Sequence, residues 1–412
     1  MKETKFKDTE IGRIPEEWSI CNFGDVLCTF SAGATPYRGI PDYYNGKINW
    51  ISSGELNYNV IYDTIEHISE EALRNTNLCL HAPGTFLMAI TGLEATGTRG
   101  KCAFVGAPSA TNQSCLAING TNKMDIKYLY WYYRMYGDYL AFKYSQGTKQ
   151  QSFTATIVKN LPITYPKQVI EQHHIASALT SIDNLIASLG KLIEKKKNIK
   201  QGAMQQILTG KTRLKGFTEP WVYRKISEIA TTSSGGTPSR SIPNYYYGDI
   251  KWFTTTELKD NYLYDSVEHI TREALNNSSA KMFSANTILM AMYGATIGKL
   301  GVLKEPSTTN QACCAIKCND IVEIFLFYIL LYNRKSIIEK GCGAGQPNIS
   351  QAIVNELSFL VPPCEKEQQA IATILTKMDN EITALEAKRA KYEAIKQGMM
   401  QQLLTGKIRL IS

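Results

Sequence analysis

An internal duplication constrains this chain more than any other feature. Residues 35–50 recur 202 positions later as residues 237–252, with Thr-Pro, Arg, Ile-Pro, Tyr-Tyr, Gly, Ile and Trp in the same order and spacing. The offset falls to 198 by residue 111 and to 196 by residue 157, and both copies finish on Met-Gln-Gln-x-Leu-Thr-Gly-Lys. The first copy therefore carries extra residues near 91–100 and 119–147. A repeat of this length predicts two related folding units.

Each copy begins with a part that is rich in Gly, Thr and aromatic residues, over about 17–166 and 219–362. Short apolar runs between turn residues, such as 85–90 and 287–292, are typical of strands. Aromatic residues at helical spacing in 128–144 could form a base-stacking surface. Because the counterpart 322–338 is mostly aliphatic, a helix packed in the core is the favoured prediction.

Each copy ends in a segment with a heptad pattern. Its apolar residues recur at alternating spacings of four and three, which is the a/d seam of a coiled coil. Gly210 and Gly406 follow the last apolar turn, where a C-cap glycine is favoured. A helix over 168–209 would be roughly 60 Å long. The predicted seam consists of Ile175, Leu179, Ile182, Ile186, Leu189, Ile193, Ile371, Leu375, Met378, Ile382 and Leu385.

The predicted fold is α+β: two duplicated globular α/β-mixed domains joined by two long antiparallel coiled-coil helices. We expect the domains at 1–166 and 217–362 and the helices at 167–216 and 363–412. Antiparallel pairing would place the domains at opposite ends, related by a pseudo-twofold axis.

Composition and targeting signals indicate an ordinary globular protein. The chain is 44% apolar and 20% charged, and no apolar run approaches the roughly 18–20 residues of a membrane span. The N-terminus lacks the apolar core of a signal peptide, and the ten scattered cysteines fit no disulfide framework. We therefore expect a cytoplasmic protein.

Catalytic and metal-binding motifs find little support. Asp249, Glu257 and Lys259 match the Asp…Glu-x-Lys spacing of a Mg²⁺-dependent nuclease, but the first copy lacks the equivalent aspartate and lysine. None of the five histidines forms a zinc-ligand pair. The equivalent His67 and His269 could share a role, and a structural hydrogen bond is the simpler one. We expect no metal, no cofactor and a binding protein rather than an enzyme.

Two similar domains on a rigid spacer can hold two binding surfaces at a fixed distance, as dimeric DNA-binding proteins do. In this arrangement the sequence resembles the specificity (S) subunits of Type I restriction–modification systems. The resemblance covers nearly the whole chain. It rests on Gly12-x-Ile14-Pro15-x-x-Trp18, on the Ile-Pro-x-Tyr … Gly-x-Ile-x-Trp block in both copies, and on the two coiled-coil tails.

The resemblance implies that each globular domain is a target recognition domain that reads one half of a split site in double-stranded DNA. The helices would fix the gap between the halves and dock two methyltransferase (M) subunits. Those subunits would carry S-adenosylmethionine and the adenine methylation, and motor-nuclease (R) subunits would join them. The chain itself would be non-catalytic. Because some loops differ between the matching copies, we expect an asymmetric bipartite target.

Base edges are read by Arg, Lys, Asn and Gln presented in a groove. Three pairs of loops offer such side chains: 35–38 with 237–240, 92–101 with 293–299, and 147–152 with 343–348. Arg38 and Arg240 could instead be structural ion-pair partners, and any of these loops could simply be solvated. The candidates for DNA contact are Arg38, Thr98, Arg99, Lys101, Lys149, Gln150, Gln151, Arg240, Tyr293, Thr296, Lys299, Gln346 and Asn348.

The net charge of +8 lies in the tails. Residues 161–218 hold nine basic and three acidic side chains and residues 359–412 hold eight and six, whereas 17–160 and 219–358 are neutral. A run of lysines on a helix is either a solvated face or a contact for DNA phosphates between the half-sites. The candidates for phosphate contact are Lys195, Lys196, Lys197 and Lys200.

Two other functions stay open. A duplicated carbohydrate- or peptide-binding head on a coiled-coil stalk would show no salt-linked affinity for duplex DNA. A nuclease that uses Asp249, Glu257 and Lys259 would cleave DNA with Mg²⁺ as the purified chain alone.

Overall fold

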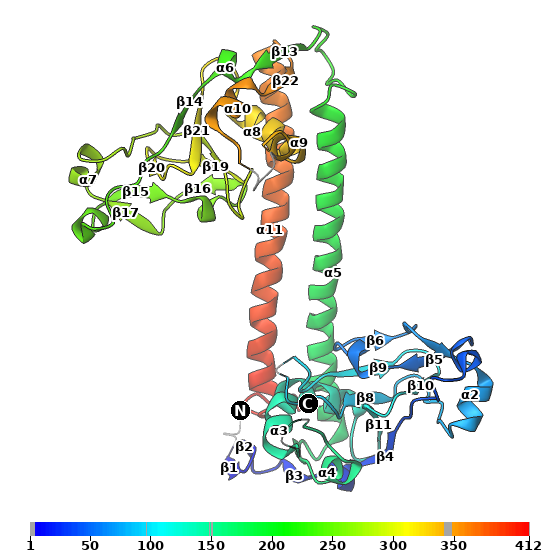
Figure 1. Ribbon diagram of the computed structural model, residues 1–412. Helices are drawn as coiled ribbons and strands as arrows, with labels where there is room; N and C mark the ends of the chain where they lie inside the picture. The colour runs from blue at the N-terminus through cyan, green and yellow to red at the C-terminus, as the bar shows by residue number, and fades with distance from the viewer. Residues whose placement is uncertain (1–4, 96, 148, 150, 342–347, 412) are drawn as a thin grey trace. The chain divides into compact units, whose positions relative to one another are not determined.

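The computed structural model describes residues 5–95, 97–147, 149, 151–341 and 348–411. The chain forms two compact units, traced in Figure 1. Unit 1 consists of Met1–Leu189 and Lys388–Ser412, and unit 2 consists of Gly190–Ala387. Each unit therefore combines the globular part of one repeat with segments from the tails of both.

The centre of unit 1 is a five-stranded sheet that is buried on both faces. Its order is β4-β11-β8-β9-β6, and every pair is antiparallel except β6 with β9. Alternate residues of β8 enter two different cores, with Phe86 and Met88 in one and Leu87 and Ala89 in the other. This period of two is what a sheet between two apolar layers requires. The strands are β4 (Leu27–Ala32), β6 (Val60–Ile61), β8 (Phe86–Ala89), β9 (Cys102–Val105) and β11 (Cys115–Gly120).

A smaller three-stranded sheet lies at the side of unit 1 remote from the long helices (Figure 1). Its order is β10-β5-β7, and Trp50 and Ile68 from it pack with Ala72 of a short helix. Two further strand pairs, β1-β2 and β3-β12, complete the unit. The elements are β1 (Phe6–Thr9), β2 (Gly12–Pro15), β3 (Ser19–Asn22), α1 (Phe23–Val26), η1 (Pro41–Tyr44), β5 (Ile48–Ile51), η2 (Ser53–Glu55), β7 (His67–Ile68), α2 (Glu70–Asn75), β10 (Ser109–Thr111), α4 (Ala155–Lys159) and β12 (Pro162–Tyr165).

The predicted aromatic core helix is confirmed as α3 (Ile126–Tyr144). Tyr128, Trp131, Tyr132 and Tyr133 are among the largest fully buried side chains of the protein. The helix packs between the five-stranded sheet and the first long helix, where Trp131 donates a hydrogen bond to Thr180. Its aromatic residues therefore build the core rather than a stacking surface.

Unit 2 repeats this arrangement. Its sheets have the orders β14-β21-β18-β19-β16 and β17-β15-β20. The counterpart of α3 is divided at Asn333 into α8 and α9. The elements are β13 (Val222–Lys225), α6 (Ile226–Ile229), β14 (Ala230–Ser234), η3 (Pro243–Tyr246), β15 (Ile250–Phe253), η4 (Thr255–Glu257), β16 (Asn261–Leu263), β17 (Glu268–Ile270), α7 (Arg272–Asn276), β18 (Ile288–Ala291), β19 (Leu300–Leu303), β20 (Thr308–Thr309), β21 (Cys313–Cys318), α8 (Glu323–Tyr332), α9 (Arg334–Lys340), α10 (Gln351–Glu356) and β22 (Ser358–Val361).

The two predicted long helices are confirmed as α5 (Val169–Ile207) and α11 (Glu365–Leu403). They pack antiparallel within each unit. In unit 1 an early position of α5, Asp183, pairs with a late position of α11, Lys396, at 2.6 Å. In unit 2 the late Lys200 of α5 pairs with the early Asp379 of α11 at 2.5 Å.

The residues of the predicted seam differ in how far they are buried and in which elements surround them. Ile182, Leu189, Ile193 and Ile382 are buried in the described structure, in line with a helix–helix seam. Ile186, Met378 and Leu385 are half-buried. The first apolar positions of each helix lie in cores that the globular part shares with the end of the other long helix, which contributes Met400 and Leu403 in unit 1 and Met204 and Ile207 in unit 2. These first positions are Ile175, Leu179, Ile371 and Leu375.

Within the described residues, no helix is both long and apolar enough to cross a membrane. The cysteines described there carry free thiols, and Cys313 and Cys314 are fully buried in strand β21.

Candidate nucleic-acid interface

The structure brings together two of the three loops of unit 1 that the sequence predicts to contact DNA. Leu93 donates its backbone N–H to the carbonyl of Gln151 at 3.0 Å, and the N–H of Gln151 bonds to the Glu94 carboxylate at 3.0 Å. Just outside the loops, Phe153 donates to the carbonyl of Ile90. Residues 92–101 and 147–152 therefore form one surface, although about fifty residues separate them in sequence.

Both cationic side chains of the 92–101 loop have partners. The Arg99 guanidinium pairs with Asp138 at 2.9 Å and lies over the Phe142 ring. The Lys101 ammonium donates to Asn57 at 2.7 Å. Thr98 and Gln151 are partly exposed and Lys149 is exposed, whereas Gln150 lies outside the described residues.

In unit 2 the described end of the corresponding loop makes an equivalent contact. Tyr293 and Asn348 form a β-bridge, and Ile349 donates its N–H to the carbonyl of Met292 at 2.7 Å. The bridge is equivalent to one between Thr91 and Ser152 in unit 1. The two loops are thus neighbours in unit 1, and in unit 2 the 293–299 loop neighbours Asn348, while residues 343–347 lie outside the described residues.

The cationic residue of the 293–299 loop is also paired. Lys299 lies 3.0 Å from Asp260, which Arg334 of α9 also contacts. Thr296 is partly exposed, and Gln346 lies outside the described residues. A glycine is required where the loop ends, since Gly298 has a φ of +73° and its missing Cβ would lie 3.1 Å from the Arg334 side chain.

The third predicted loop pair presents arginines that are already engaged. Arg38 makes a bidentate ion pair with Glu66, at 2.5 and 2.8 Å, and lies 4.1 Å from the centre of the Tyr44 ring. Arg240 repeats both contacts with Glu268 and Tyr246. The hydrogen bonds from the arginines lower the pKa of both glutamates below their ordinary value. These contacts favour the alternative that both arginines are structural ion-pair partners. Both guanidiniums nevertheless remain about half exposed.

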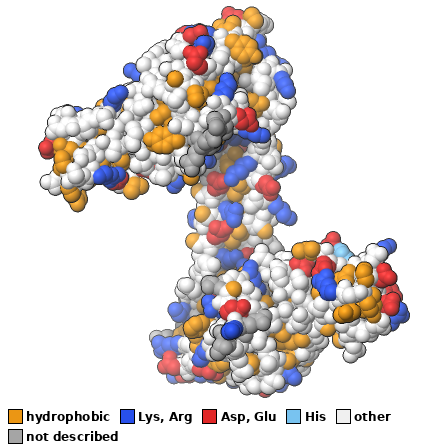
Figure 2. Space-filling model, viewed as in Figure 1, with side chains coloured by type: hydrophobic (Ala, Val, Ile, Leu, Met, Phe, Trp, Pro, Cys, Tyr) orange, Lys and Arg blue, Asp and Glu red, His pale blue; other side chains and the backbone are white. Residues whose placement is uncertain are grey.

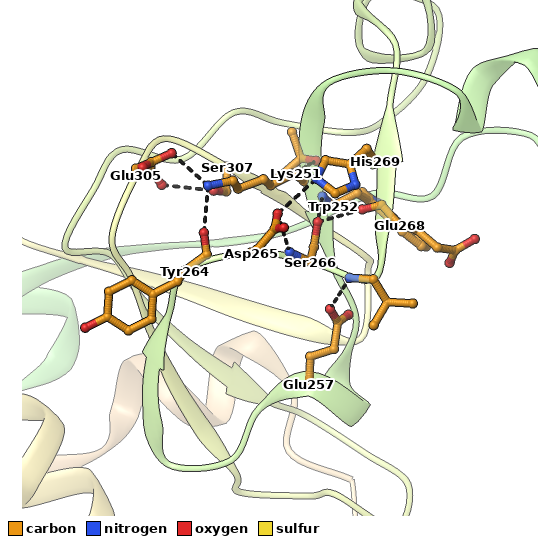
Figure 3. A network of polar contacts seen from close by, with 12 residues as sticks. Lys251, Trp252, Glu257, Tyr264, Asp265, Ser266, Glu268, His269, Glu305 and Ser307 are labelled. Carbon is orange, nitrogen blue, oxygen red and sulfur yellow. Dashed lines mark hydrogen bonds and ion pairs between the residues drawn. The ribbon is translucent and has the colours of Figure 1, made fainter. Parts of the chain in front are cut away.

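Glu257, the central residue of the nuclease alternative, has a structural role because its carboxylate binds backbone amides. Its carboxylate accepts the N–H of Thr254 at 2.7 Å. It also accepts the N–H of Val267 at 2.8 Å, the dashed line at Glu257 in Figure 3. Glu55 makes the equivalent contacts in unit 1, to Ser52 and Ile65. In the part of the chain that the structure describes, no group of three or more His, Cys, Asp or Glu could hold a metal ion.

The two equivalent histidines have the structural role that was expected of them. His67 lies 2.9 Å from the Asp63 carboxylate, and His269 lies 3.0 Å from Asp265. Each contact spans the loop that connects the five-stranded sheet to the small three-stranded sheet, between β6 and β7 or between β16 and β17.

Most of the predicted phosphate-binding lysines are paired with acidic side chains of α11. In unit 2, Lys196 lies 2.6 Å from Glu381 and Lys197 lies 2.7 Å from Glu386. Lys200 is the partner of Asp379 described above. Lys195 is exposed, and so is its neighbour on the helix, Lys191. These pairs favour the solvated-face alternative for three of the four lysines.

The ion pairs that fix the tail after each long helix to the start of the other long helix were not predicted from the sequence. In unit 1, Arg409 binds the buried Glu171 with two hydrogen bonds. In unit 2, Arg213 binds the buried Glu367 in the same way. The signal was available, because both tails keep an arginine three residues after the Thr-Gly of the repeated motif and both helices keep a glutamate near their start.

A glutamine repeated in both helices adds a second link at the same place. The Gln172 side chain accepts the N–H of Asp125 at the start of α3 and donates to the carbonyls of Lys123 and Pro166. Gln368 accepts the N–H of Val322 at the start of α8. Each long helix therefore begins by capping the helix of its own globular part.

Comparison with known proteins agrees with this architecture. A family model described as the Type I restriction modification DNA specificity domain matches residues 15–200 and 218–397. The MjaIX Type I restriction enzyme specificity subunit of Methanocaldococcus jannaschii is 32% identical over 430 residues, covering 99% of this chain and 97% of that protein. The MjaVIII specificity subunit of the same organism is 26% identical over 440 residues, covering 99% and 97%.

Solved structures show the same fold. The S subunit of a Type I restriction–modification system from M. genitalium superposes with a TM-score of 0.64 at 16% identity, covering 94% of this chain and 96% of that one. A chain from a structural study of Type I system assembly and conformational transition gives a TM-score of 0.54 at 14% identity, covering 96% and 99%.

Proposed function

The chain belongs to the Type I restriction–modification DNA specificity subunits, and from that premise we propose that each unit reads one half of a bipartite target in double-stranded DNA. A specificity subunit selects the site and is not the catalytic component of its enzyme. In this proposal the long helices set the spacing of the half-sites and dock two methyltransferase subunits. Those subunits bring S-adenosylmethionine, motor-nuclease subunits join them, and the complex acts in the cytoplasm.

The observation that carries the proposal is the pairing of two predicted loops in unit 1, with an equivalent contact at Asn348 in unit 2. Residues 92–101 lie against 147–152 in unit 1, and the 293–299 loop lies against Asn348 in unit 2. The scaffold under these loops is repeated element by element, whereas the loops differ in length and sequence. Divergent loops on equivalent scaffolds suit two domains that read different sequences, because side chains at base edges decide specificity.

The reading residues proposed here are those of the joined loops. In unit 1 they are Thr98, Arg99, Lys101, Lys149, Gln150 and Gln151, and in unit 2 they are Tyr293, Thr296, Lys299, Gln346 and Asn348. Arg99, Lys101 and Lys299 would exchange their present partners for base or phosphate oxygens. Arg38 and Arg240 are left out, because their ion pairs with Glu66 and Glu268 already use the two-pronged face that would bind guanine.

The direct test is to map methylated adenines in DNA from cells that express this chain with its methyltransferase subunit. We expect a split, asymmetric sequence. A chimera in which unit 1 carries the 293–299 and 343–348 loops of unit 2 should change one half of the target and leave the other half unchanged. Methylation at an unsplit site, or a chimera that retains the original target, would contradict the assignment.

A further inference from the structure

One surface of the protein is duplicated without an evident role in folding. The loop that connects β6 to β7 in unit 1 presents Tyr62 and Ile65, which are 70% and 86% exposed. The equivalent loop between β16 and β17 in unit 2 presents Tyr264 and Val267, at 66% and 84%. Residues 62–67 and 264–269 are called the duplicated loops below.

Both duplicated loops are held rigid by the same hydrogen bonds. In unit 2, Ser266 accepts the N–H of Trp252 at 3.1 Å and donates to the carbonyl of Glu268 at 2.7 Å (Figure 3). The Glu257 carboxylate holds the N–H of Val267. Figure 3 shows the Tyr264 ring directed away from this network.

The same bonds recur in unit 1. Thr64 accepts the N–H of Trp50 at 3.1 Å and donates to the carbonyl of Glu66, and Glu55 holds the N–H of Ile65. The loops are thus fixed platforms for exposed apolar side chains, and a preformed surface loses little conformational entropy on binding.

Neither folding nor solubility explains the apolar residues at these tips. A tyrosine and a β-branched aliphatic residue occupy the same two exposed positions in both copies, whereas the proposed reading loops of the two copies have diverged. A further exposed aliphatic residue follows each paired arginine by two positions, Ile40 at 39% and Ile242 at 41%. Figure 2 shows apolar side chains gathered on the corresponding part of each unit. Clustered exposed apolar side chains indicate a binding surface.

The charge of the duplicated loops opposes contact with DNA. Each contains one aspartate and one glutamate and no Lys or Arg. Because Arg38 and Arg240 pair with the two glutamates, the aspartates carry the negative charge of the loops. The Asp63 side chain is 82% exposed and that of Asp265 is 71% exposed. Hydrogen bonds from His67 and His269 lower the pKa of these aspartates, so both stay ionised at neutral pH. Exposed carboxylates repel phosphates and attract a basic protein surface.

We propose that the duplicated loops are docking surfaces, additional to the long helices, for a protein partner that occurs twice in the assembly, one copy on each unit. This inference rests on the proposed function, which supplies such a partner in the methyltransferase subunit. A repeated surface fits a repeated occupant, just as divergent reading loops fit two different half-sites. The partner would contribute an apolar patch bordered by Lys and Arg.

The test uses the full chain co-expressed with the methyltransferase subunit. One variant combines Tyr62→Ser with Ile65→Ser, a second combines Tyr264→Ser with Val267→Ser, and a third carries all four changes. A matched control replaces two other exposed residues, Val222→Ser with Tyr223→Ser. Native mass spectrometry and sedimentation measure how many methyltransferase subunits are bound, and a duplex carrying the mapped target measures DNA affinity.

Each two-residue variant should retain one methyltransferase subunit at normal affinity. The fourfold variant should bind both subunits at least about tenfold more weakly, as expected when interface anchors are truncated. The DNA affinity of the fourfold variant chain and the assembly of the control should match the unmodified protein. Unchanged assembly, a loss of DNA affinity with intact assembly, or a change only in self-association would each overturn the inference.

Failure of the proposed function gives a different result. An unmodified chain that neither recruits methyltransferase subunits nor directs adenine methylation overturns the proposed function and this inference with it. If the unmodified chain does both and the fourfold variant does so equally well, only the inference fails.

Discussion

Arg409 and Glu171 are 238 positions apart and form a bidentate ion pair in unit 1, with N–O distances of 2.6 and 2.9 Å. The Glu171 side chain is fully buried, and the Arg409 side chain is 12% exposed. The guanidinium also pairs with Glu17 and lies near the Trp18 ring. The tail that follows α11 is thereby fixed to the start of α5.

Removing this arginine should destabilise unit 1 strongly. Arg409→Ala leaves a buried carboxylate without its partner, and breaking a buried pair in this way costs about 3–5 kcal/mol. Urea unfolding of the full chain measures the change. Arg389→Ala, in an exposed pair with Glu393 on α11, serves as the control and should cost less than about 1 kcal/mol. If the two substitutions lowered the free energy of unfolding equally, the buried pair would contribute no more to stability than the exposed pair.

The first repeat alone should self-associate. Arg213 occupies the position in the first tail that Arg409 occupies in the second, and it makes the same contacts to Glu367. In a protein of residues 1–216, Arg213 of one copy can therefore bind Glu171 of another. Sedimentation should detect a dimer, and Arg213→Ala should weaken it. A concentration-independent monomer would rule this out.

Unit 1 should lose stability in acid through Asp183. Burial raises the pKa of this carboxyl, but the hydrogen bond from Lys396 and the charges of Arg134 and Lys396 outweigh burial and lower it below the ordinary 3.8. The stabilisation is therefore fully present above the unfolded pKa and is lost as the pH falls through the lower folded pKa.

Lys396→Met should make the free energy of unfolding depend less steeply on pH below about 4. Denaturant titrations at several pH values measure the slope. The exposed Lys191→Met is the control and should leave the slope unchanged. A steeper slope in Lys396→Met would show that this pairing is misassigned.

The lysines of α5 should differ in their effect on DNA binding. Lys191→Ala with Lys195→Ala removes exposed charges, so affinity should fall equally for all sequences, with the salt slope reduced by about 0.9 for each DNA phosphate that is no longer neutralised. Lys196→Ala with Lys197→Ala removes lysines paired with Glu381 and Glu386 and should change the slope less. Binding isotherms across a salt series test this, and an altered sequence preference would contradict it.

The arginines of the 35–38 and 237–240 loops should stabilise the fold and should not contact DNA bases. Arg38→Ala and Arg240→Ala should leave the methylated sequence unchanged. A double-mutant cycle of Arg240 with Glu268 should give a coupling of about 0.2–1 kcal/mol, as for exposed pairs. A relaxed or altered base in the mapped target would show instead that the arginine exchanges its glutamate for DNA.

Local patterns in the sequence were sufficient for the framework. The offset repeat predicted two related units, and the heptad spacing predicted α5 and α11, because periodic apolar residues report which face of a helix must be buried. The same reasoning placed the aromatic residues of α3 in the core. It did not indicate that Ile175 and Ile371 also pack against the globular parts, since periodicity reports burial and not every element that provides it.

The partners of charged residues were decided by the tertiary structure alone. Arg38 and Glu66 are 28 positions apart, and Arg409 and Glu171 are 238 apart. A long flexible side chain pairs with the opposite charge that the fold places near it. The spacing of residues in the sequence does not indicate which charge that is. The adjacency of the 92–101 and 147–152 loops arises in the same way, from a β-bridge between Thr91 and Ser152. The sequence by itself determined the repeated units and their helices, and the packing of those units determined which residues meet.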